Sequence, residues 1–490
     1  MVNVRWLPPV FTDASSRIVG AIKSADFVPG STVWLAVTGL SRSGKTVFIT
    51  SLIHNLLSTL HNPNRMPLLR AVSERRMIAA RLNGARSAGL PGFPYRENIE
   101  IMADTSPEWP ARTDDISEIG IDIHFRPSGL VGKFVGKVSG IRATTSIRII
   151  DYPGEWLLDL PMLGQTYAQW SRSILRHYRR GVRAEAAGAY MAYISQHPHS
   201  ETASEQIARQ AHELYCAFLH EMRDRHGLSF LQPGRFLCPG NIGEVPYLWF
   251  APLDVPDSMA APAPGTLGAL MADRFEAYKR EAVSRFYEDH FRRFSRQIVL
   301  VDVLRALLAG RDAFEDTRMA IEAILQSFRY GGGGGVFGSG GVLGRLLRGW
   351  HVDKVLFAAT KADHVPENER ANLAALLKNM AAFPAIDVAS ANAQINTTAL
   401  ASVLSTADDT EEIDGERLQV VVGRPIGARK QSKFFVGHVP AKPPRPDAWD
   451  EPFLNVPLFE PPAIDPSPVD GIAHINLDFA LEFLLGDRLR

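Results

Sequence analysis

Residues 39–46 have the composition and spacing of a phosphate-binding loop. They are Gly-Leu-Ser-Arg-Ser-Gly-Lys-Thr and fit the pattern G-x-x-x-x-G-K-[ST]. Glycines let backbone N–H groups turn toward phosphate oxygens, and the N-terminus of a following helix adds positive potential. In this pattern Lys45 neutralises the β- and γ-phosphates, and the Thr46 hydroxyl ligates Mg²⁺. The alternative is a glycine-rich turn with an incidental lysine. The residues predicted to bind nucleotide here are Gly39, Ser41, Arg42, Ser43, Gly44, Lys45, Thr46 and Val47.

The segment Asp151-Tyr152-Pro153-Gly154 places a D-x-x-G pattern directly after an apolar run. An aspartate at the C-terminal end of a strand can hold Mg²⁺ through a water molecule, and the Gly154 N–H can bind a γ-phosphate. The same pattern is common in ordinary turns. Its place after a hydrophobic strand, downstream of a phosphate loop, favours the functional interpretation.

A third polar cluster, Thr360-Lys361-Ala362-Asp363, also follows an apolar run. The Asp363 carboxylate can accept hydrogen bonds from the N1–H and N2–H₂ groups of guanine, whereas adenine has no such pair of donors. The stem of Lys361 can lie along the face of the base. The alternative is a helix-capping aspartate, but the order of the three motifs favours guanine recognition.

The elements that must position these motifs alternate between strands and helices. Apolar runs predict strands at residues 31–38, 116–126, 145–150, 298–303, 354–359 and 397–402. Helical spacing predicts helices at 47–60, 312–329 and 368–383, mostly helical structure over 165–296, and a last helix with Asn476 as its N-cap. Residues 61–110 are expected to be long loops with at most short helices, and the proline-dense residues 423–470 to be extended or hairpin-like. This order predicts an α/β fold with a mostly parallel sheet covered on both faces.

Composition limits the classes of function. The 490 residues are about three domains' worth at roughly 150 residues per domain. The 53 Lys+Arg balance 53 Asp+Glu, so no global charge favours nucleic acid or an anionic membrane as the main partner. Two cysteines are too few for a disulfide framework, the N-terminus lacks a signal-peptide pattern, and no apolar run reaches the ~18 residues of a membrane span. We therefore expect a cytoplasmic protein.

The order of phosphate loop, D-x-x-G and [NT]KxD is similar to that of the P-loop GTPases. More specifically, the chain resembles the YcjX-like family of bacterial GTPases over essentially its whole length. The segments that carry this resemblance are GLSRSGKT at 39–46, WPART at 109–113, IIDYPGEWLLDLPML at 149–163, FAATKADHV at 357–365 and INLDFALEFLLGDRL at 475–489. The resemblance implies a Ras-like, doubly wound GTPase core enlarged by a helical insertion. It also implies GTP hydrolysis with Mg²⁺ and a link to bacterial stress.

Further site residues are placed by position. Thr113 lies just before the strand expected at 116–126 and is the candidate switch threonine that completes the Mg²⁺ shell. Arg112 and Arg42 can approach developing charge on the γ-phosphate, although a surface or scaffold role fits each of them as well. Ser402, at the end of its predicted strand, completes the nucleotide-binding set.

Two positions depart from the general GTPase pattern. Glu155 follows Gly154, where Ras-like proteins carry a water-orienting glutamine. A carboxylate there can act as a general base or contact a loop instead, so Glu155 is a catalytic candidate. Thr360 stands where asparagine is usual, and its hydroxyl makes only part of the bridge that an amide makes, which predicts a looser preference for guanine.

The sequence thus predicts a slow, stress-related switch GTPase that converts GTP to GDP and phosphate. The predicted core spans 28–164 and 297–490, with an extended proline-rich segment at 410–470, and the helical insertion spans 165–296. The catalytic candidates are Lys45, Thr113, Glu155 and Arg112, and the metal-site residues are Thr46, Thr113 and Asp151.

The expected partners are a guanine nucleotide and a protein that binds the helical insertion, with no nucleic acid. Contact with a membrane surface through a basic face is an alternative to a simple solvated face, and its arginines are at 172, 176, 179, 180 and 183. Two other functions remain open: an ATPase or kinase on the same fold, and a nucleotide-dependent scaffold without relevant hydrolysis.

Overall fold

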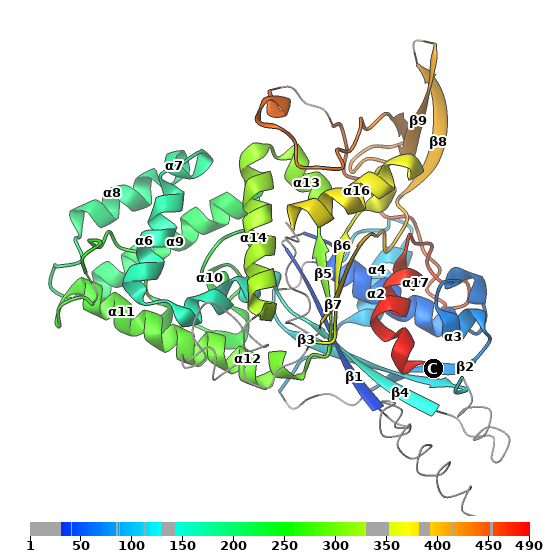
Figure 1. Cartoon of the computed structure of the whole chain (residues 1–490), viewed down its shortest axis with the longest axis horizontal. Helices are drawn as coiled ribbons and strands as arrows, with labels where there is room; N and C mark the ends of the chain where they lie inside the picture. The colour runs from blue at the N-terminus through cyan, green and yellow to red at the C-terminus, as the bar shows by residue number, and fades with distance from the viewer. Residues whose placement is uncertain are drawn as a thin grey trace, which may run out of the picture.

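The structure is a computed structural model of the chain. It describes residues 31–40, 42–84, 87, 89–111, 114–128, 143–259, 261–329, 352–381, 393–413, 415–450 and 454–490, without the side chains of 326–329. Ser41, Arg112 and Thr113 therefore lie outside the described residues, as do residues 28–30 of the predicted core. In Figure 1 a twisted sheet stands at the centre, a group of helices lies to one side, and a long β-hairpin projects beyond the sheet.

The central sheet has seven strands in the order β2-β3-β4-β1-β5-β6-β7. The strands are β1 (Ser31–Gly39), β2 (Met77–Asn83), β3 (Ser117–Phe125), β4 (Ala143–Asp151), β5 (Arg296–Val301), β6 (Lys354–Ala359) and β7 (Gln394–Ala399). Strands β4, β1, β5, β6 and β7 are parallel, whereas β2 and β3 pair antiparallel. Because parallel strands end at the same edge, the loops that follow them lie together. This mixed α/β arrangement is consistent with the predicted Ras-like core.

Apolar side chains of the strands alternate between two buried faces of the sheet. In β1, Leu35 and Val37 belong to one apolar cluster and Ala36 to the other. The first face is covered by α2 (Lys45–Ser58), α4 (Tyr95–Ala103) and α17 (Leu477–Leu485). The second is covered by α13 (Val303–Leu308), α14 (Arg311–Arg329) and α16 (Glu367–Met380). Helices on both faces bury the hydrophobic strands that a parallel sheet requires.

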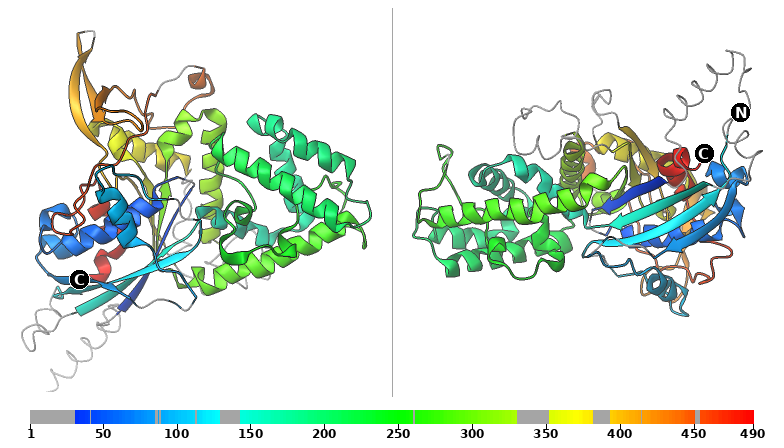
Figure 2. Two further views of the ribbon diagram at one scale, coloured as in Figure 1. Left: turned by 180° about the vertical axis from the view of Figure 1, so that it is seen from behind. Right: turned by 90° about the horizontal axis from the view of Figure 1, so that it is seen from below.

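Between β4 and β5 the chain is mostly helical, and these helices stand beside the sheet in both views of Figure 2. They are η2 (Gly154–Gly164), α6 (Tyr167–Tyr178), α7 (Val182–Ala186), α8 (Gly188–Gln196), α9 (Glu205–Asp224), α10 (Gly234–Leu237), η3 (Gly240–Ile242), η4 (Pro246–Leu248), α11 (Leu267–Tyr278), η5 (Lys279–Ser284), α12 (Arg285–Asp289) and η6 (Phe291–Arg293). The aromatic side chains at 275–294 are buried here, and the ring centroids of Phe275 and Trp170 are 5.2 Å apart. They form part of the apolar core of these helices.

The C-terminal part adds a second, smaller sheet. Its order is β10-β9-β8, formed by β8 (Thr406–Ile413), β9 (Glu416–Gly423) and β10 (Ser432–Phe434). The β8–β9 hairpin is the projection in Figure 1. The short helices of the chain are η1 (Pro63–Arg65), α3 (Arg70–Ser73), η8 (Ala362–His364), η10 (Pro446–Trp449) and η11 (Gly486–Arg488).

The prediction for residues 61–110 is wrong in part. Short helices such as α4 agree with it, but the segment also contains the strand β2. Strand β2 is an edge strand with mostly half-exposed residues, so it lacks the apolar run of a central strand. The prediction for the proline-dense residues 423–470 agrees with the antiparallel bridges of Pro425 with Phe459 and of Gly437 with Leu454, although the long β8–β9 hairpin lies before most of this segment.

Two boundary predictions are also corrected. Strand β7 ends at Ala399, so Ser402 lies in the loop beyond it rather than in the strand. Asn476 does precede α17, but it does not cap the helix with its side chain, and its φ of 58° is left-handed. Its Nδ2 instead donates a hydrogen bond to the Ala399 carbonyl, 2.9 Å away, which joins α17 to the end of β7.

No helix in the described ranges is both long enough and apolar enough to span a membrane. Three of the five arginines considered for membrane contact pair with carboxylates of the same chain: Arg172 with Asp257, Arg179 with Asp254 and Arg183 with Asp316. These pairs reduce the positive charge that this face offers to another surface. Membrane contact stays a prediction.

Candidate functional site

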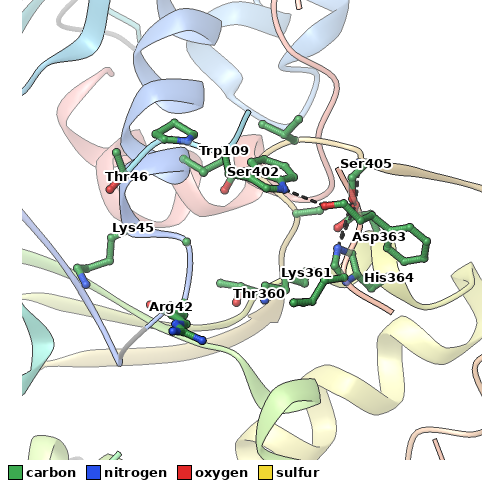
Figure 3. Close-up of a pocket in the computed structure, with 18 of the residues that line it drawn as sticks. Arg42, Lys45, Thr46, Trp109, Thr360, Lys361, Asp363, His364, Ser402 and Ser405 are labelled. Atoms are coloured by element: carbon green, nitrogen blue, oxygen red, sulfur yellow. Dashed lines mark hydrogen bonds and ion pairs between the residues drawn. The ribbon is translucent and has the colours of Figure 1, made fainter. Parts of the chain in front are cut away.

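A cavity of about 340 Å³ lies at the edge of the sheet where the parallel strands end (Figure 3). Residues 42–47 at the start of α2 form one end, and the loops after β6 and β7 form the other. The lining residues are Arg42, Ser43, Gly44, Lys45, Thr46, Val47, Trp109, Pro110, Ala111, Thr360, Lys361, Asp363, His364, Ala401, Ser402, Val403, Ser405, Ile426, Leu458 and Phe459. The first and third sequence motifs therefore meet in one cavity.

The phosphate loop has the backbone geometry that its glycines allow. Gly44 has a φ of 86°, and a Cβ there would meet nothing within 4 Å, so the backbone and not crowding favours glycine at this position. Arg42 is also left-handed, with a φ of 61°. Lys45 is buried, and its Nζ donates to the Gly39 carbonyl at 3.3 Å. The Thr46 hydroxyl donates to the Ala111 carbonyl at 3.4 Å.

Arg42 reaches from this loop toward the helices that precede β5. Its Nη2 lies 3.8 Å from Oδ1 of Asp224, at the end of α9, and its side chain is 55% exposed. Burial and the nearby Arg42 charge lower the pKa of Arg305, which lies in α13. The arginine predicted near the γ-phosphate thus contacts the helical region in this structure.

Behind the phosphate loop, three glycines bring backbones into direct contact. A Cβ on Gly154 would lie 2.3 Å from the carbonyl oxygen of Gly39. A Cβ on Gly234, in α10, would lie 2.1 Å from the carbonyl oxygen of Glu155. Such distances leave no room for any side chain, so the D-x-x-G segment is packed between the phosphate loop and α10.

The segment after Gly154 is buried instead of exposed. The carboxylate of Asp159 accepts hydrogen bonds from the Gly234 N–H, at 2.8 and 3.0 Å, and from the Tyr278 hydroxyl. Burial raises the pKa of Asp159 to about 7. Trp156 donates from Nε1 to the Cys238 carbonyl at 2.8 Å, and the Arg235 guanidinium lies over its ring. The helices before β5 therefore hold this segment in place.

Asp151 and Glu155 lie near the site but do not line the cavity. Asp151 ends β4, is buried, and is paired in register with Val37 of β1. Glu155 is 5% exposed and follows the glycine contact between the two loops. Gly39 and Gly154 also lie behind the cavity lining, in contact with each other.

The third motif begins where β6 ends, and its turn brings Asp363 to the cavity. Lys361 has a φ of 60°, and its Nζ lies 2.5 Å from Oδ2 of Asp302. The Thr360 hydroxyl donates to the Val301 carbonyl at 3.4 Å. Lys361 and Thr360 thus join the motif to the neighbouring strand β5 and its following loop.

The Asp363 carboxylate is held in a fixed orientation. Its Oδ2 accepts hydrogen bonds from the Ser405 N–H at 2.8 Å and the Ser405 hydroxyl at 2.7 Å. Nε2 of His364 lies 3.3 Å from the same hydroxyl oxygen. Burial lowers the pKa of His364, so its imidazole is neutral at neutral pH. The two hydrogen bonds from Ser405 to one oxygen fix the orientation of the Asp363 carboxylate.

Several lining residues were not predicted from the motifs. Trp109 lies within the WPART segment, so its place in a family motif was a usable signal. Ser405, Ile426, Leu458 and Phe459 belong to no motif and come from the C-terminal part. The described residues include no group of three or more His, Cys, Asp or Glu placed to hold a metal ion.

Comparison with known proteins gives a consistent result over nearly the whole chain. The model of the YcjX-like family matches residues 33–489. The chain is 36% identical over 462 residues to a protein of Escherichia coli (strain K12) named "Ras-like GTPase YcjX", covering 93% of this chain and 96% of that protein. It is 32% identical over 471 residues to a protein of the same name from Shewanella oneidensis (strain MR-1), covering 93% and 94%.

Proposed function

Because the chain belongs to the YcjX-like family, we propose that it binds GTP and hydrolyses it to GDP and phosphate with Mg²⁺. The name of the two relatives, Ras-like GTPase, supports guanine-nucleotide binding. The observation that carries the proposal is the single cavity lined by both Lys45 and Asp363. A phosphate-binding lysine at one end and a guanine-reading carboxylate at the other fit the two ends of one nucleotide.

At the phosphate end, the chain binds by charge and by backbone N–H groups. Lys45 opens α2, so its ammonium and the helix N-terminus present positive potential to the same place. Its present partner is a neutral carbonyl, the oxygen of Gly39, which a phosphate oxygen can replace with a stronger, charge-assisted bond. Lys45 then neutralises charge that develops on the transferred phosphoryl group.

The residues predicted around Mg²⁺ have suitable ligand chemistry. Thr46 and Asp151 offer hydroxyl and carboxylate oxygens, which are the hard donors that Mg²⁺ prefers. Thr46 lies in the first turn of α2, directly after the phosphate loop, and Asp151 ends β4, which pairs with the strand that precedes this loop. When bound, the ion neutralises the β- and γ-phosphate charge. The Thr46 hydroxyl donates a hydrogen bond to the Ala111 carbonyl, which supports our proposal that Thr113, two residues further on, belongs to this site.

At the base end, Asp363 selects guanine by its two ring donors. Adenine has no such pair of donors, so it would leave unpaired the acceptor positions of this buried carboxylate that Ser405 does not fill, which costs binding energy. The Thr360 hydroxyl is bonded to the Val301 carbonyl and offers no amide, so we propose that Asp363 carries most of the discrimination.

We further propose that hydrolysis is slow. We also propose that the helices before β5 form an insertion whose arrangement depends on whether GTP or GDP is bound. The contact between Gly154 and Gly39, and the contact between Glu155 and Gly234, link the phosphate loop to α10 without an intervening side chain. A change at the γ-phosphate therefore reaches these helices through rigid backbone contacts. The stress-related role follows from the family resemblance.

A nucleotide-dependent scaffold is the second candidate. Its support is the position of Glu155, which is buried and outside the lining of the cavity. Without a group that orients water, binding would change the structure while turnover stayed negligible.

The test measures phosphate release from GTP by Lys45→Ala. Lys442→Ala is the control, because Lys442 is an exposed lysine that does not line the cavity. We expect loss of nucleotide binding and turnover in Lys45→Ala only. Equal turnover in both variants would refute the proposal, and GTP binding without measurable turnover in the wild type would favour the scaffold.

A further inference from the structure

One wall of the cavity is apolar, and its residues belong neither to the phosphate loop at 39–46 nor to the motif at 360–363. Ile426 and Leu458 line it and are 57% and 59% exposed, the highest values among the large apolar side chains of the described residues. Trp109 and Phe459 line the cavity with them. We call these four residues the base wall. Aliphatic side chains exposed beside a cavity are stabilised when a flat apolar ligand covers them.

Two contacts of Phe459, one with His364 and one with Trp109, fix the base wall to the rest of the site. Phe459 is buried, and its ring meets that of His364 edge-on, with 5.0 Å between centroids. The Phe459 carbonyl accepts a hydrogen bond from Nε1 of Trp109 at 2.8 Å. The wall is therefore fixed to the residue beside Asp363 and to the loop that runs toward the phosphate end.

The exposed pair sits on a small two-stranded ribbon. The Ile426 N–H donates to the Leu458 carbonyl at 2.8 Å, and the Glu460 N–H donates to the Arg424 carbonyl at 2.9 Å. Nη2 of Arg424 also lies 2.6 Å from Oε2 of Glu460. These bonds hold Ile426 and Leu458 side by side before any ligand arrives, which lowers the ordering cost of binding.

We infer that the base wall binds the purine ring of the nucleotide and sets how slowly the nucleotide leaves. This inference rests on the proposed function. Asp363 recognises one edge of the ring, so the apolar faces need a surface at the same end of the cavity, and the base wall is that surface. The C-terminal segment is thus part of the nucleotide site, and the bond between Trp109 and Phe459 joins it to the loop beside Thr46.

The experiment measures dissociation of radiolabelled GDP into excess unlabelled GDP. Leu458→Ala and Ile426→Ala are each expected to release GDP roughly 3- to 30-fold faster than wild type, since each removes most of an aliphatic surface from the ring. Leu60→Ala is the matched control, because Leu60 is 49% exposed and does not line the cavity. Trp109→Phe keeps a ring but removes the N–H donor, and a faster release of about 2- to 5-fold is expected.

A second probe separates the base from the phosphates. Tripolyphosphate has no base, so it should bind the base-wall variants as tightly as wild type. Release of GDP at the control rate would overturn the inference, as would an equal loss of tripolyphosphate affinity. If wild type binds GDP while the variants behave like the control, only the base wall fails. If wild type binds no GDP, the proposed function fails with it.

Discussion

The cavity has a proposed phosphate end and a proposed base end, and different kinds of contact form them. At the phosphate end, backbones touch directly: Gly154 lies against Gly39, and Gly234 lies against Glu155. At the base end, side chains from distant segments form the site, among them Ser405 and the exposed Leu458. Close backbone packing cannot adjust to a new atom, whereas a side-chain surface can lose one contact and keep the rest. We therefore expect substitutions in the backbone contacts at the phosphate end to act on folding, and those at the base end to act on binding.

Gly154→Ala is the variant with the largest expected effect, and it tests the close backbone packing at the phosphate end. The new methyl group would lie 2.3 Å from a backbone oxygen, so we expect a loss of roughly 3 kcal/mol or more in the free energy of unfolding, together with loss of nucleotide binding. Chemical denaturation measures the first and GDP binding the second. Gly188→Ala is the control, since a Cβ there meets nothing within 4 Å. Equal stability of the two variants would contradict the close packing.

The next largest effect is expected for Asp363→Asn. The amide cannot accept from both guanine donors, so GTP and GDP affinity should fall about 100-fold while the free energy of unfolding changes little. A xanthine ring carries a carbonyl where guanine carries its amino group, and the new amide can donate to it. Xanthosine diphosphate should therefore bind the variant better than GDP does. Asp447→Asn, at an exposed aspartate, serves as the control. Undiminished GDP affinity would show that Asp363 does not recognise the base.

Asp159 gives the phosphate end a predicted pH dependence. Its pKa of about 7 in the folded state lies above the ordinary value, so the folded state binds a proton that the unfolded state has lost between about pH 4 and pH 7. Stability should therefore fall as pH rises through this range, by about 2 kcal/mol between pH 5 and 7, and level off above it. Denaturation midpoints of wild type and Asp159→Asn measure the difference. Parallel pH profiles of these two proteins would contradict the assignment.

The smallest effect is expected for Ser405→Ala. The hydroxyl bond to Asp363 is lost, but the Ser405 N–H still donates to the same oxygen. We expect GDP affinity to fall by about 3- to 10-fold, with the preference for GDP over ADP reduced. Calorimetric titration with both nucleotides measures this. A loss as large as that of Asp363→Asn would mean that the base end is as rigid as the phosphate end.

The local pattern of apolar residues was sufficient to predict the strands and helices that carry the motifs. The helix after the phosphate loop and the strands before Asp151 and Thr360 were predicted to within a few residues, because buried strands and amphipathic helices leave a periodic trace in the sequence. The edge strand β2 and the acidic strand β8 leave no such trace, since their residues are mostly half-exposed or exposed and follow no apolar period. Asn476 shows the same limit, since its amide bonds to Ala399 of a distant strand instead of capping its own helix.

The residue types and order of the three motifs already predicted a phosphate loop, a D-x-x-G turn and a guanine-type cluster, because each is a short segment whose chemistry is local. Only the folded chain brings Trp109 to Phe459, Ser405 to Asp363, and Gly234 against Glu155. These contacts join segments that lie tens to hundreds of residues apart, and their geometry depends on how the sheet, the helices before β5 and the C-terminal segment pack. No local pattern encodes that packing, because each partner is an ordinary residue until the other one is placed beside it.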